Sequence, residues 1–365
     1  MYFNQLWLKD FRNYRGAELM IPAEGVILFE GENGSGKSNL LEAFAYVATL
    51  RSFRGAPVGA LIRTGASEAV LRGVAQSGQR EVLVEVQLIA SGRGVVRINR
   101  QPLRRSQELS SVVPVIVFSP DDLELVKGVP EARRDYLDEL LVNLHGRDAT
   151  LRADFGRVLH QRNALLRSMG GIVRSVVGRT LDVWDDKLAE LGESLARERE
   201  SVVDSLRPYV RDATRRLGAE PTSGLSVGLA YERSWRGTLA EAVGAARHED
   251  VRRGVTTVGP QRDDLIVSLG GLPARVQASQ AEQRCLALGL RLGAHSLVAA
   301  ARGVNPVLVL DDVFSELDAR RSTALAASLP VGQTLLASAV SPPPGLPVAA
   351  RARIVQGTVA SIDLA

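Results

Sequence analysis

A short stretch near the N-terminus decides the fold of this chain: Gly31-Glu32-Asn33-Gly34-Ser35-Gly36-Lys37-Ser38. It fits the phosphate-loop pattern G-x-x-x-x-G-K-[ST], and it follows an apolar run at residues 26–29, as such a loop follows a buried strand. Backbone N–H groups of such a loop and of the helix that begins there converge on the β- and γ-phosphates. Lys37 supplies a positive charge, and Ser38 supplies an oxygen ligand for Mg²⁺. The eight residues therefore predict that the chain binds a nucleoside triphosphate.

The composition indicates a folded protein from a reducing compartment. The chain has 365 residues, of which 45% are hydrophobic and 24% are charged, as in an ordinary globular protein. No apolar run approaches the roughly 18 residues that span a bilayer, and the first residues lack a signal-peptide pattern. Cys285 is the only cysteine, so no intrachain disulfide can form. We expect a cytoplasmic protein without membrane contact, and the net charge of +4 weakly favours an anionic partner.

Strand patterns occur in two parts of the chain that lie far apart in the sequence. In the first part, β-branched and alternating segments predict an antiparallel meander and then a buried strand, at residues 70–74, 82–89, 95–98 and 112–118. In the second part, strands are expected at residues 265–269, 307–310 and 335–337, with a helix at 279–301. The two parts are expected to form one α/β domain.

Helical periodicity and dense charge separate these parts, from residue 121 to about residue 253. Apolar residues spaced by three and four positions predict a long helix in this stretch that ends near Pro208, because proline breaks a helix interior. The predicted fold class is therefore α/β, with a helical arm domain inserted into a P-loop ATPase head. The expected domains are residues 1–120 for the N-terminal half of the head, 121–256 for the arm and 257–365 for the C-terminal half.

A second nucleotide motif stands in the C-terminal half. Four apolar residues at 307–310 run into Asp311 and Asp312, the pattern of a Walker B strand whose end presents carboxylates beside the nucleotide. Asp311 is expected to hold Mg²⁺, directly or through water, and Asp312 to polarise the attacking water. The predicted catalytic residues are Asp312 and Lys37, and the predicted metal ligands are Ser38 and Asp311.

Ser279 opens the helix that precedes this strand, and two interpretations of it remain open. A serine at a helix N-terminus is ordinarily a cap. In ATPases of the ABC type, however, a serine-led signature segment occupies this place and contacts the γ-phosphate that the opposite subunit holds. Residues 315–318 (SELD) then have the matching position at a dimer interface. Ser279 is therefore also a candidate nucleotide-binding residue.

Several stretches resemble the RecF family, whose fold is an ABC/SMC-like ATPase head with a helical arm. They are residues 10–14 (DFRNY), the phosphate loop, residues 118–138 (FSPDDLELVKGVPEARRDYLD) and residues 308–318 (LVLDDVFSELD). Residues 51–54 (RSFR) and 259–264 (GPQRDD) are also similar to family segments. The stretch that begins at Ser119-Pro120 is more specific than the nucleotide motifs, because general ABC transporters lack it.

The resemblance implies an ATP- and Mg²⁺-dependent recombination mediator with weak ATPase activity. It implies binding to DNA at single-strand/double-strand junctions of gaps, and action with RecO and RecR to load RecA in repair and replication restart. The physical hypothesis is that ATP in the phosphate loop of one subunit is completed by Ser279 of another, so that two heads close around DNA in a homodimer. Hydrolysis through Asp312 then reopens them.

Three departures from ABC-type patterns predict slow hydrolysis, with nucleotide acting as a dimerisation latch. Ala281 stands where the family usually has glycine in the signature, and its methyl group could crowd the phosphate contact. Ser119-Pro120 replaces the glutamine of transporter ATPases, and Ser338 follows the last predicted strand where a switch histidine is usual. The four histidines, His145, His160, His248 and His295, show no metal-ligand spacing.

DNA contact is expected to be electrostatic and independent of base sequence, since no helix-turn-helix, zinc finger or aromatic stacking platform occurs. Candidate groove residues are Arg51, Arg54, Arg104 and Arg105, although ordinary surface arginines explain them equally well. Two other functions stay open. An ABC transporter ATPase subunit shares both nucleotide motifs, and an SMC-like structural DNA tether shares the head but needs longer heptad arms.

Overall fold

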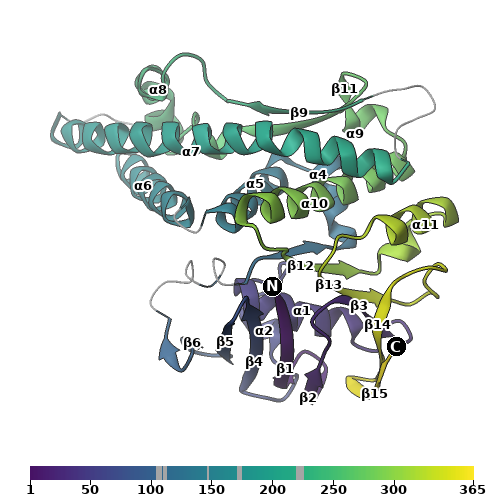
Figure 1. Ribbon diagram of the computed structural model, residues 1–365. Helices are drawn as coiled ribbons and strands as arrows, with labels where there is room; N and C mark the ends of the chain where they lie inside the picture. The colour runs from purple at the N-terminus through teal and green to yellow at the C-terminus, as the bar shows by residue number, and fades with distance from the viewer. Residues whose placement is uncertain (104–108, 110–112, 146–147, 171–174, 219–225) are drawn as a thin grey trace. The chain divides into compact units, whose positions relative to one another are not determined.

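The phosphate-loop strand lies inside a six-stranded sheet (Figure 1). A computed structural model of the chain describes residues 1–103, 109, 113–145, 148–170, 175–218 and 226–365. The strands of this sheet are, in spatial order, β15 (Thr358–Leu364), β14 (Val348–Val355), β3 (Gly25–Glu30), β13 (Gln333–Ser338), β12 (Val307–Asp311) and β8 (Val115–Phe118). All neighbours are parallel except β14 and β15. Every residue of β12 and β13 is buried, as expected of parallel strands that are covered on both faces, and the predicted strands at 307–310 and 335–337 are confirmed.

A second six-stranded sheet is antiparallel throughout. Its strands are, in spatial order, β2 (Tyr14–Met20), β1 (Tyr2–Phe11), β4 (Glu68–Ser77), β5 (Arg80–Ile89), β6 (Val95–Ile98) and β7 (Gln101–Pro102). Strands β4, β5 and β6 confirm the predicted meander. Helix α1 (Lys37–Thr49) shares one hydrophobic core with both sheets: the ring of its Phe44 lies 5.4 Å from that of Phe3 in β1 and 6.2 Å from that of Phe29 in β3, centroid to centroid. The helix that follows the phosphate loop is therefore fixed by packing on two sides.

Both sheets belong to the first of two compact units, which comprises Met1–Leu123, Pro208–Leu225 and Ala278–Ala365. Its other described helical elements are α2 (Val58–Leu61), η1 (Pro120–Leu123), α10 (Gln280–Arg302), η3 (Val313–Glu316), α11 (Ala319–Ser328) and the end of α7 (Ser175–Arg216) from Pro208 onward. Helix α10 confirms the helix predicted at 279–301.

The second unit comprises Glu124–Arg207 and Ser226–Gln277. Its helical elements are α4 (Glu124–Lys127), α5 (Pro130–Leu144), α6 (Asp148–Ser168), most of α7 (Ser175–Arg216), α8 (Leu239–Arg253), η2 (Pro260–Arg262) and α9 (Ala274–Gln277). It also holds a three-stranded antiparallel sheet, in the order β11 (Leu272–Pro273), β10 (Asp264–Leu269) and β9 (Val227–Glu232). The prediction of helix up to about residue 253 is wrong for β9, whose buried Val227 and Leu229 alternate with exposed or half-buried residues as in a strand.

The expected end of the long helix near Pro208 is also wrong, because α7 continues through this proline to Arg216 (Figure 1). Beyond the proline, the helix packs against α10 at two glycines. A β-carbon at Gly293 would lie 2.6 Å from a methyl group of Val210, and one at Gly289 would lie 2.3 Å from the methyl group of Thr214. Such close helix packing supplies the stabilisation that offsets the backbone hydrogen bond lost at proline.

The bounds of the two compact units differ from the predicted domain boundaries, which lie between residues 120 and 121 and between residues 256 and 257. Residues 257–277 group with the helical unit, because β10 pairs with β9 and β11, and residues 208–225 group with the head. In the described ranges, no helix combines the length and the apolar character that crossing a bilayer requires.

Candidate nucleotide site

The predicted phosphate loop forms a tight turn between β3 and α1. Its three glycines, Gly31, Gly34 and Gly36, have φ values of 157°, 78° and 116°, a region that residues with a β-carbon rarely adopt. Asn33 and Gly34 are exposed, whereas Ser35, Gly36 and Lys37 are buried. Lys37 Nζ donates to the carbonyl oxygens of Gly31 and Glu32 at 2.7 and 2.8 Å, so its ammonium group lies within the curve of the loop.

The Walker B carboxylates come together with the end of this loop. Ser38 Oγ donates to Asp311 Oδ1 at 2.7 Å, a contact between residues that are 273 positions apart. Burial raises the pKa of Asp311, while the hydrogen bond from Ser38 and the positive charge of Arg54 act in the opposite direction. Burial also lowers the pKa of Lys37, against the attraction of Asp312 and Asp311. Neighbouring acidic and basic groups whose pKa values are shifted in opposite directions, as here, are typical of a binding or catalytic site.

Asp312 occupies an unusual backbone position next to Asp311. Its φ and ψ values of 50° and 32° are left-handed, a conformation that aspartate tolerates better than most residues. Its Oδ2 accepts from Ser315 Oγ at 2.8 Å, and its backbone N–H donates to Ala337 at the end of β13. These bonds fix the second carboxylate at the carboxyl ends of β12 and β13, the edge at which open parallel sheets bind ligands.

The donor set fits a magnesium nucleotide. The Ser38 hydroxyl and the Asp311 carboxylate are hard oxygen donors within hydrogen-bond distance of each other, and Mg²⁺ in nucleotide sites needs only one or two protein oxygens beside phosphate and water. No cluster of three or more His, Cys, Asp or Glu side chains suited to a metal occurs among the residues that the structure describes.

Ser279 is the N-cap of α10, with a complete capping box. Its hydroxyl accepts from the Glu282 N–H, and the Glu282 carboxylate accepts from the Ser279 N–H at 2.7 Å. Both Ser279 and Ala281 are exposed. Thus Lys37, Ser38, Asp311 and Asp312 are brought together, while the hydrogen bonds of Ser279 stay within the first turn of its own helix.

The other sequence departures have structural roles in the first unit. Ser119, after β8, donates its N–H to Asp122 Oδ2 at 2.9 Å, and Asp122 Oδ1 pairs with Arg291 of α10 at 2.7 Å. Ser338 is buried at the end of β13, where its hydroxyl donates to Val340 O. Two turns also contact the phosphate loop, through Asn13, Tyr14 and Gly357. The sequence marked residues 10–14 only as a family-like stretch and did not mark Gly357, because only the fold brings these residues to the loop.

Of the four candidate groove arginines, Arg104 and Arg105 lie outside the described residues. Arg51 is exposed. Arg54 donates to Asn39 Oδ1 at 3.1 Å, and its charge acts on the pKa of Asp311, so it lies on the nucleotide side of the head.

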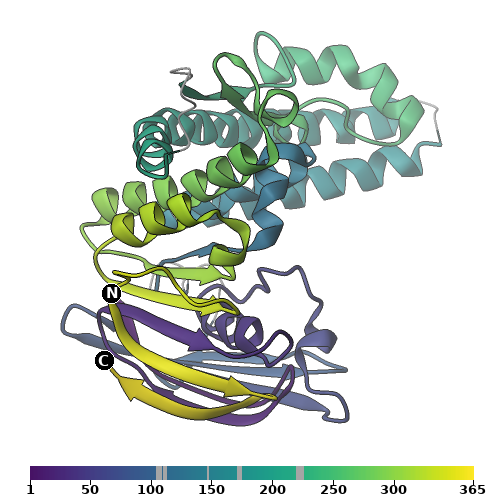
Figure 2. The same ribbon diagram turned by 90° about the vertical axis from the view of Figure 1, so that its right-hand side faces the viewer.

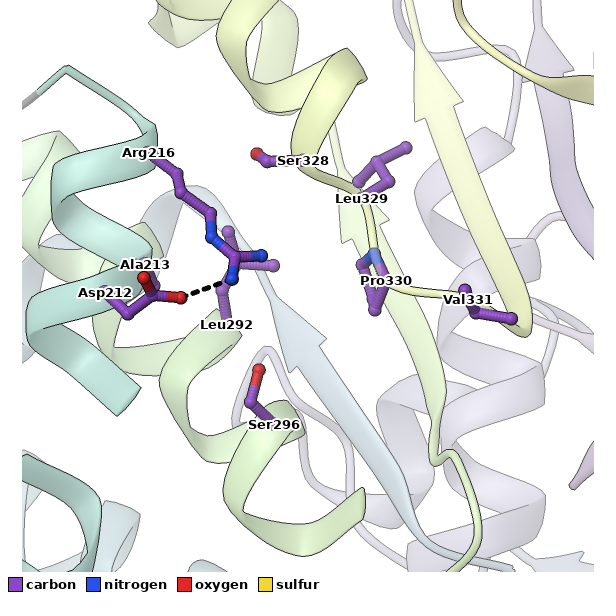
Figure 3. Close-up of a pocket in the computed structure, with 9 residues that line it drawn as sticks. All are labelled: Asp212, Ala213, Arg216, Leu292, Ser296, Ser328, Leu329, Pro330 and Val331. Carbon is purple, nitrogen blue, oxygen red and sulfur yellow. Dashed lines mark ion pairs between the residues drawn. The ribbon is translucent and has the colours of Figure 1, made fainter. Parts of the chain in front are cut away.

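A separate cleft of about 200 Å³ lies between the end of α7, α10 and the segment after α11 (Figure 3). Leu292, Leu329, Pro330 and Val331 give it an apolar lining, and Arg216 extends over it from an ion pair with Asp212 at 2.6 Å. None of the predicted site residues lines this cleft.

Comparison with known proteins places these features in one family. The RecF/RecN/SMC N terminal domain family matches residues 2–334. A DNA replication and repair protein RecF of Frankia alni is 41% identical over 359 residues, which cover 93% of this chain and 94% of the relative. The RecF of Streptomyces avermitilis is 39% identical over 98% of this chain and 99% of the relative.

Solved structures agree with this relationship. A structure of the recombination mediator protein RecF with ATP, in the RecFOR pathway, matches 100% of this chain and 97% of its own with a TM-score of 0.89 and 26% identity. An Smc head domain of Pyrococcus furiosus, at 13% identity, has a TM-score of 0.56 over 99% of this chain and 96% of its own and shows the shared fold alone. The chain belongs to the RecF family of DNA replication and repair proteins, within the wider group of RecF and SMC ATPase heads.

Proposed function

We propose that this protein is a recombination mediator that dimerises on ATP, binds gapped DNA at single-strand/double-strand junctions and acts with RecR and RecO to promote RecA loading. The observation that carries the proposal is the joined nucleotide site in a RecF-family chain: Lys37, Ser38 and Asp311 meet although their motifs are more than 270 residues apart. The solved RecF structure that matches this chain carries ATP in its description, which supports ATP as the nucleotide.

ATP binding would use the backbone of Gly31, Glu32, Asn33, Gly34, Ser35 and Gly36 with the charge of Lys37. Lys37 would exchange its two carbonyl partners for phosphate oxygens, a charge-assisted contact that is stronger than a neutral hydrogen bond. Ser38 and Asp311 would hold Mg²⁺, which when bound neutralises charge on the β- and γ-phosphates. Asp312 would orient the attacking water as a general base, and the absence of a switch histidine at Ser338 favours weak ATPase activity.

Association of two heads would complete the site through Ser279 of the opposite subunit. The N-terminus of α10 is exposed, and the helix dipole would attract a γ-phosphate oxygen, which would replace the Glu282 carboxylate at the Ser279 N–H. Hydrolysis would remove that bridge, so nucleotide turnover would release the dimer from DNA.

Binding to DNA would be carried by the phosphate backbone, with Arg51, Arg54, Arg104 and Arg105 as candidates, and would fall steeply with salt. A protein that acts on chromosomal DNA together with RecR and RecO would be cytoplasmic. Membership of the RecF family favours this function over a transporter subunit.

Analytical ultracentrifugation with and without ATP tests the proposal. Wild-type protein is expected to sediment as a dimer with ATP, Lys37→Met is expected to lose nucleotide binding, and Ser279→Arg is expected to bind ATP but remain a monomer. A wild-type protein that stays monomeric with saturating non-hydrolysable nucleotide and gapped duplex refutes the composite site.

A further inference from the structure

Two turns from opposite ends of the sequence meet at a single carbonyl group of the phosphate loop. The carbonyl oxygen of Ser35 accepts a hydrogen bond from Asn13 Nδ2 at 3.2 Å and another from the backbone N–H of Gly357 at 2.7 Å. Asn13 lies in the turn between β1 and β2, and Gly357 lies in the turn between β14 and β15. Strands β2 and β15 contact each other, and Figure 2 shows the yellow C-terminal hairpin beside the purple N-terminal one.

The two turns pack so closely on the phosphate loop that a β-carbon has no room at the glycines of this contact. Gly357 has φ of 73°, and a β-carbon there would lie 2.4 Å from the Asn13 carbonyl oxygen. A β-carbon on Gly31 would lie 2.3 Å from the Ile354 carbonyl oxygen, and one on Gly36 would lie 2.8 Å from Asn13 Nδ2. Tyr14 adds a hydrogen bond from its hydroxyl to the Gly36 carbonyl at 3.1 Å. Glycines at these places allow backbone to pack directly on backbone.

The first turn is itself held by a buried carboxylate of α1. Arg12, with φ of 52°, donates from Nε and Nη2 to the two oxygens of Glu42 at 2.7 and 2.8 Å. Glu42 is fully buried and also accepts from Ser52 Oγ. A bidentate guanidinium–carboxylate pair fixes orientation as well as distance. Since α1 begins at Lys37, Glu42 joins the Arg12 turn to the same helix that presents the lysine.

We infer that residues 10–14 and 355–358 clamp the phosphate loop in the shape that binds nucleotide, with Glu42 and Gly357 as positioning residues. This inference rests on the proposed function, because it assigns supporting parts to the proposed ATP site. A cradle of N–H groups binds phosphate tightly only when the groups already point at one place, and the two bonds to the Ser35 carbonyl oppose rotation of the peptides that carry them. The clamp residues need no contact with ATP, so they act through the loop.

The first experiment compares Gly357→Ala with Gly345→Ala by isothermal titration with Mg-ATP. Gly345 has φ of 86°, but a β-carbon there meets no atom within 4 Å, so this control carries the backbone strain without the collision. Gly357→Ala is expected to weaken ATP binding at least tenfold, and Gly345→Ala is expected to stay within twofold of wild type. A folded Gly357→Ala protein that binds within twofold of wild type overturns the clamp.

The second experiment compares Glu42→Gln with Val47→Ala as its control. It tests the clamp even if Gly357→Ala does not fold. Val47 is fully buried on the same helix, so its truncation lowers stability without touching either turn. Glu42→Gln is expected to raise the dissociation constant for ATP at least fivefold, whereas Val47→Ala is expected to change it less than twofold at equal folded fraction. Equal affinities in the two variants count against the clamp. Wild-type protein that fails to bind Mg-ATP instead refutes the proposed function itself.

Discussion

A buried arginine of the helical unit and the phosphate-loop lysine of the head have different hydrogen-bond partners. In the helical unit, the fully buried Arg162 pairs with Asp185 at 2.6 Å and with the fully buried Asp250 at 2.7 Å. Arg199 makes two hydrogen bonds with Asp138; burial alone lowers the pKa of Arg199, but this partner raises it above the ordinary value. In the head, Lys37 Nζ donates to two carbonyl oxygens instead of a carboxylate, and burial lowers its pKa against the attraction of Asp312 and Asp311.

The difference in partners indicates that Arg162 has a structural role and that Lys37 has a role in ligand binding. An arginine that is paired with buried carboxylates has its charge already neutralised, so removing it leaves an uncompensated charge in the fold. A lysine held by neutral carbonyls gains strongly when an anion arrives. Replacing the cation by methionine should therefore affect stability at Arg162 and ligand binding at Lys37.

Arg162→Met is the strongest test of this contrast. Removing the cation leaves the Asp250 carboxylate buried with only hydroxyl and amide partners, which is expected to cost about 3–5 kcal/mol of unfolding free energy. Urea denaturation measures the loss. Arg252→Met, which breaks an exposed pair with Glu249, serves as the control and is expected to change stability very little. A similar loss in both variants contradicts the contrast.

Lys37→Met is the counterpart in the head. It removes a charge-assisted contact that alone is worth about 1.5–3 kcal/mol, so ATP affinity is expected to fall by more than roughly 100-fold, which is a loss of binding in the sedimentation experiment. The thermal midpoint of the nucleotide-free protein is expected to stay the same or rise, because the variant no longer desolvates a charge. Titration with Mg-ATP and differential scanning calorimetry check the two parts. A clear drop in the midpoint without nucleotide shows that Lys37 is a structural charge.

His295 sharpens the comparison through pH. Its ring is buried in α10 and its Nε2 lies 3.0 Å from Pro306 O; burial lowers its pKa to about 4. A depressed pKa means that the unfolded chain takes up a proton first as pH falls below about 6.5, so stability is lost in that direction. From pH 7 to pH 5 the loss from this group is expected to be about 2 kcal/mol.

His295→Gln, which keeps a donor but does not titrate, is the control for this measurement. Between pH 7 and pH 5, the unfolding free energy of His295→Gln is expected to fall by about 2 kcal/mol less than that of the wild type. Parallel pH profiles of the two proteins mean that His295 does not carry the effect.

The smallest expected effect separates the two interpretations of Ser279. Ser279→Ala removes the cap and is expected to cost about 1 kcal/mol, whereas Ser279→Asn keeps a capping oxygen and is expected to cost little. If Ser279 also completes the nucleotide site, both variants should lose ATP-dependent dimerisation. Dimerisation that survives in Ser279→Asn, measured by sedimentation, favours the cap alone.

The sequence was sufficient for the parts of the fold that depend on local patterns. Apolar runs and alternation located β3, β4, β5, β12 and β13, and the phosphate-loop and Walker B spacings named residues that the structure brings together. Each of these patterns lies within a few consecutive residues, so the local sequence is sufficient to recognise it.

The features that could not be predicted depend on tertiary contacts. Pro208 stays inside α7 because Gly289 and Gly293 let α10 pack closely beyond it. Strand β10 joins the helical unit because its partner β9 is there, a strand whose alternation was hidden in a charged, helical stretch. Glu42 looks like an ordinary helix residue in the sequence, and only the fold brings Arg12 to its carboxylate.

The position of β3 between β13 and β14 has a consequence for biosynthesis. Both neighbours of this strand are translated about 300 residues after it, which at roughly 5–20 residues per second leaves a delay of some 15–60 s. Throughout that interval, the apolar edge of β3 emerges from the ribosome without its pairing partners. The nucleotide site, which needs Asp311 beside Ser38 and β13 beside β3, can therefore form only when translation is nearly finished.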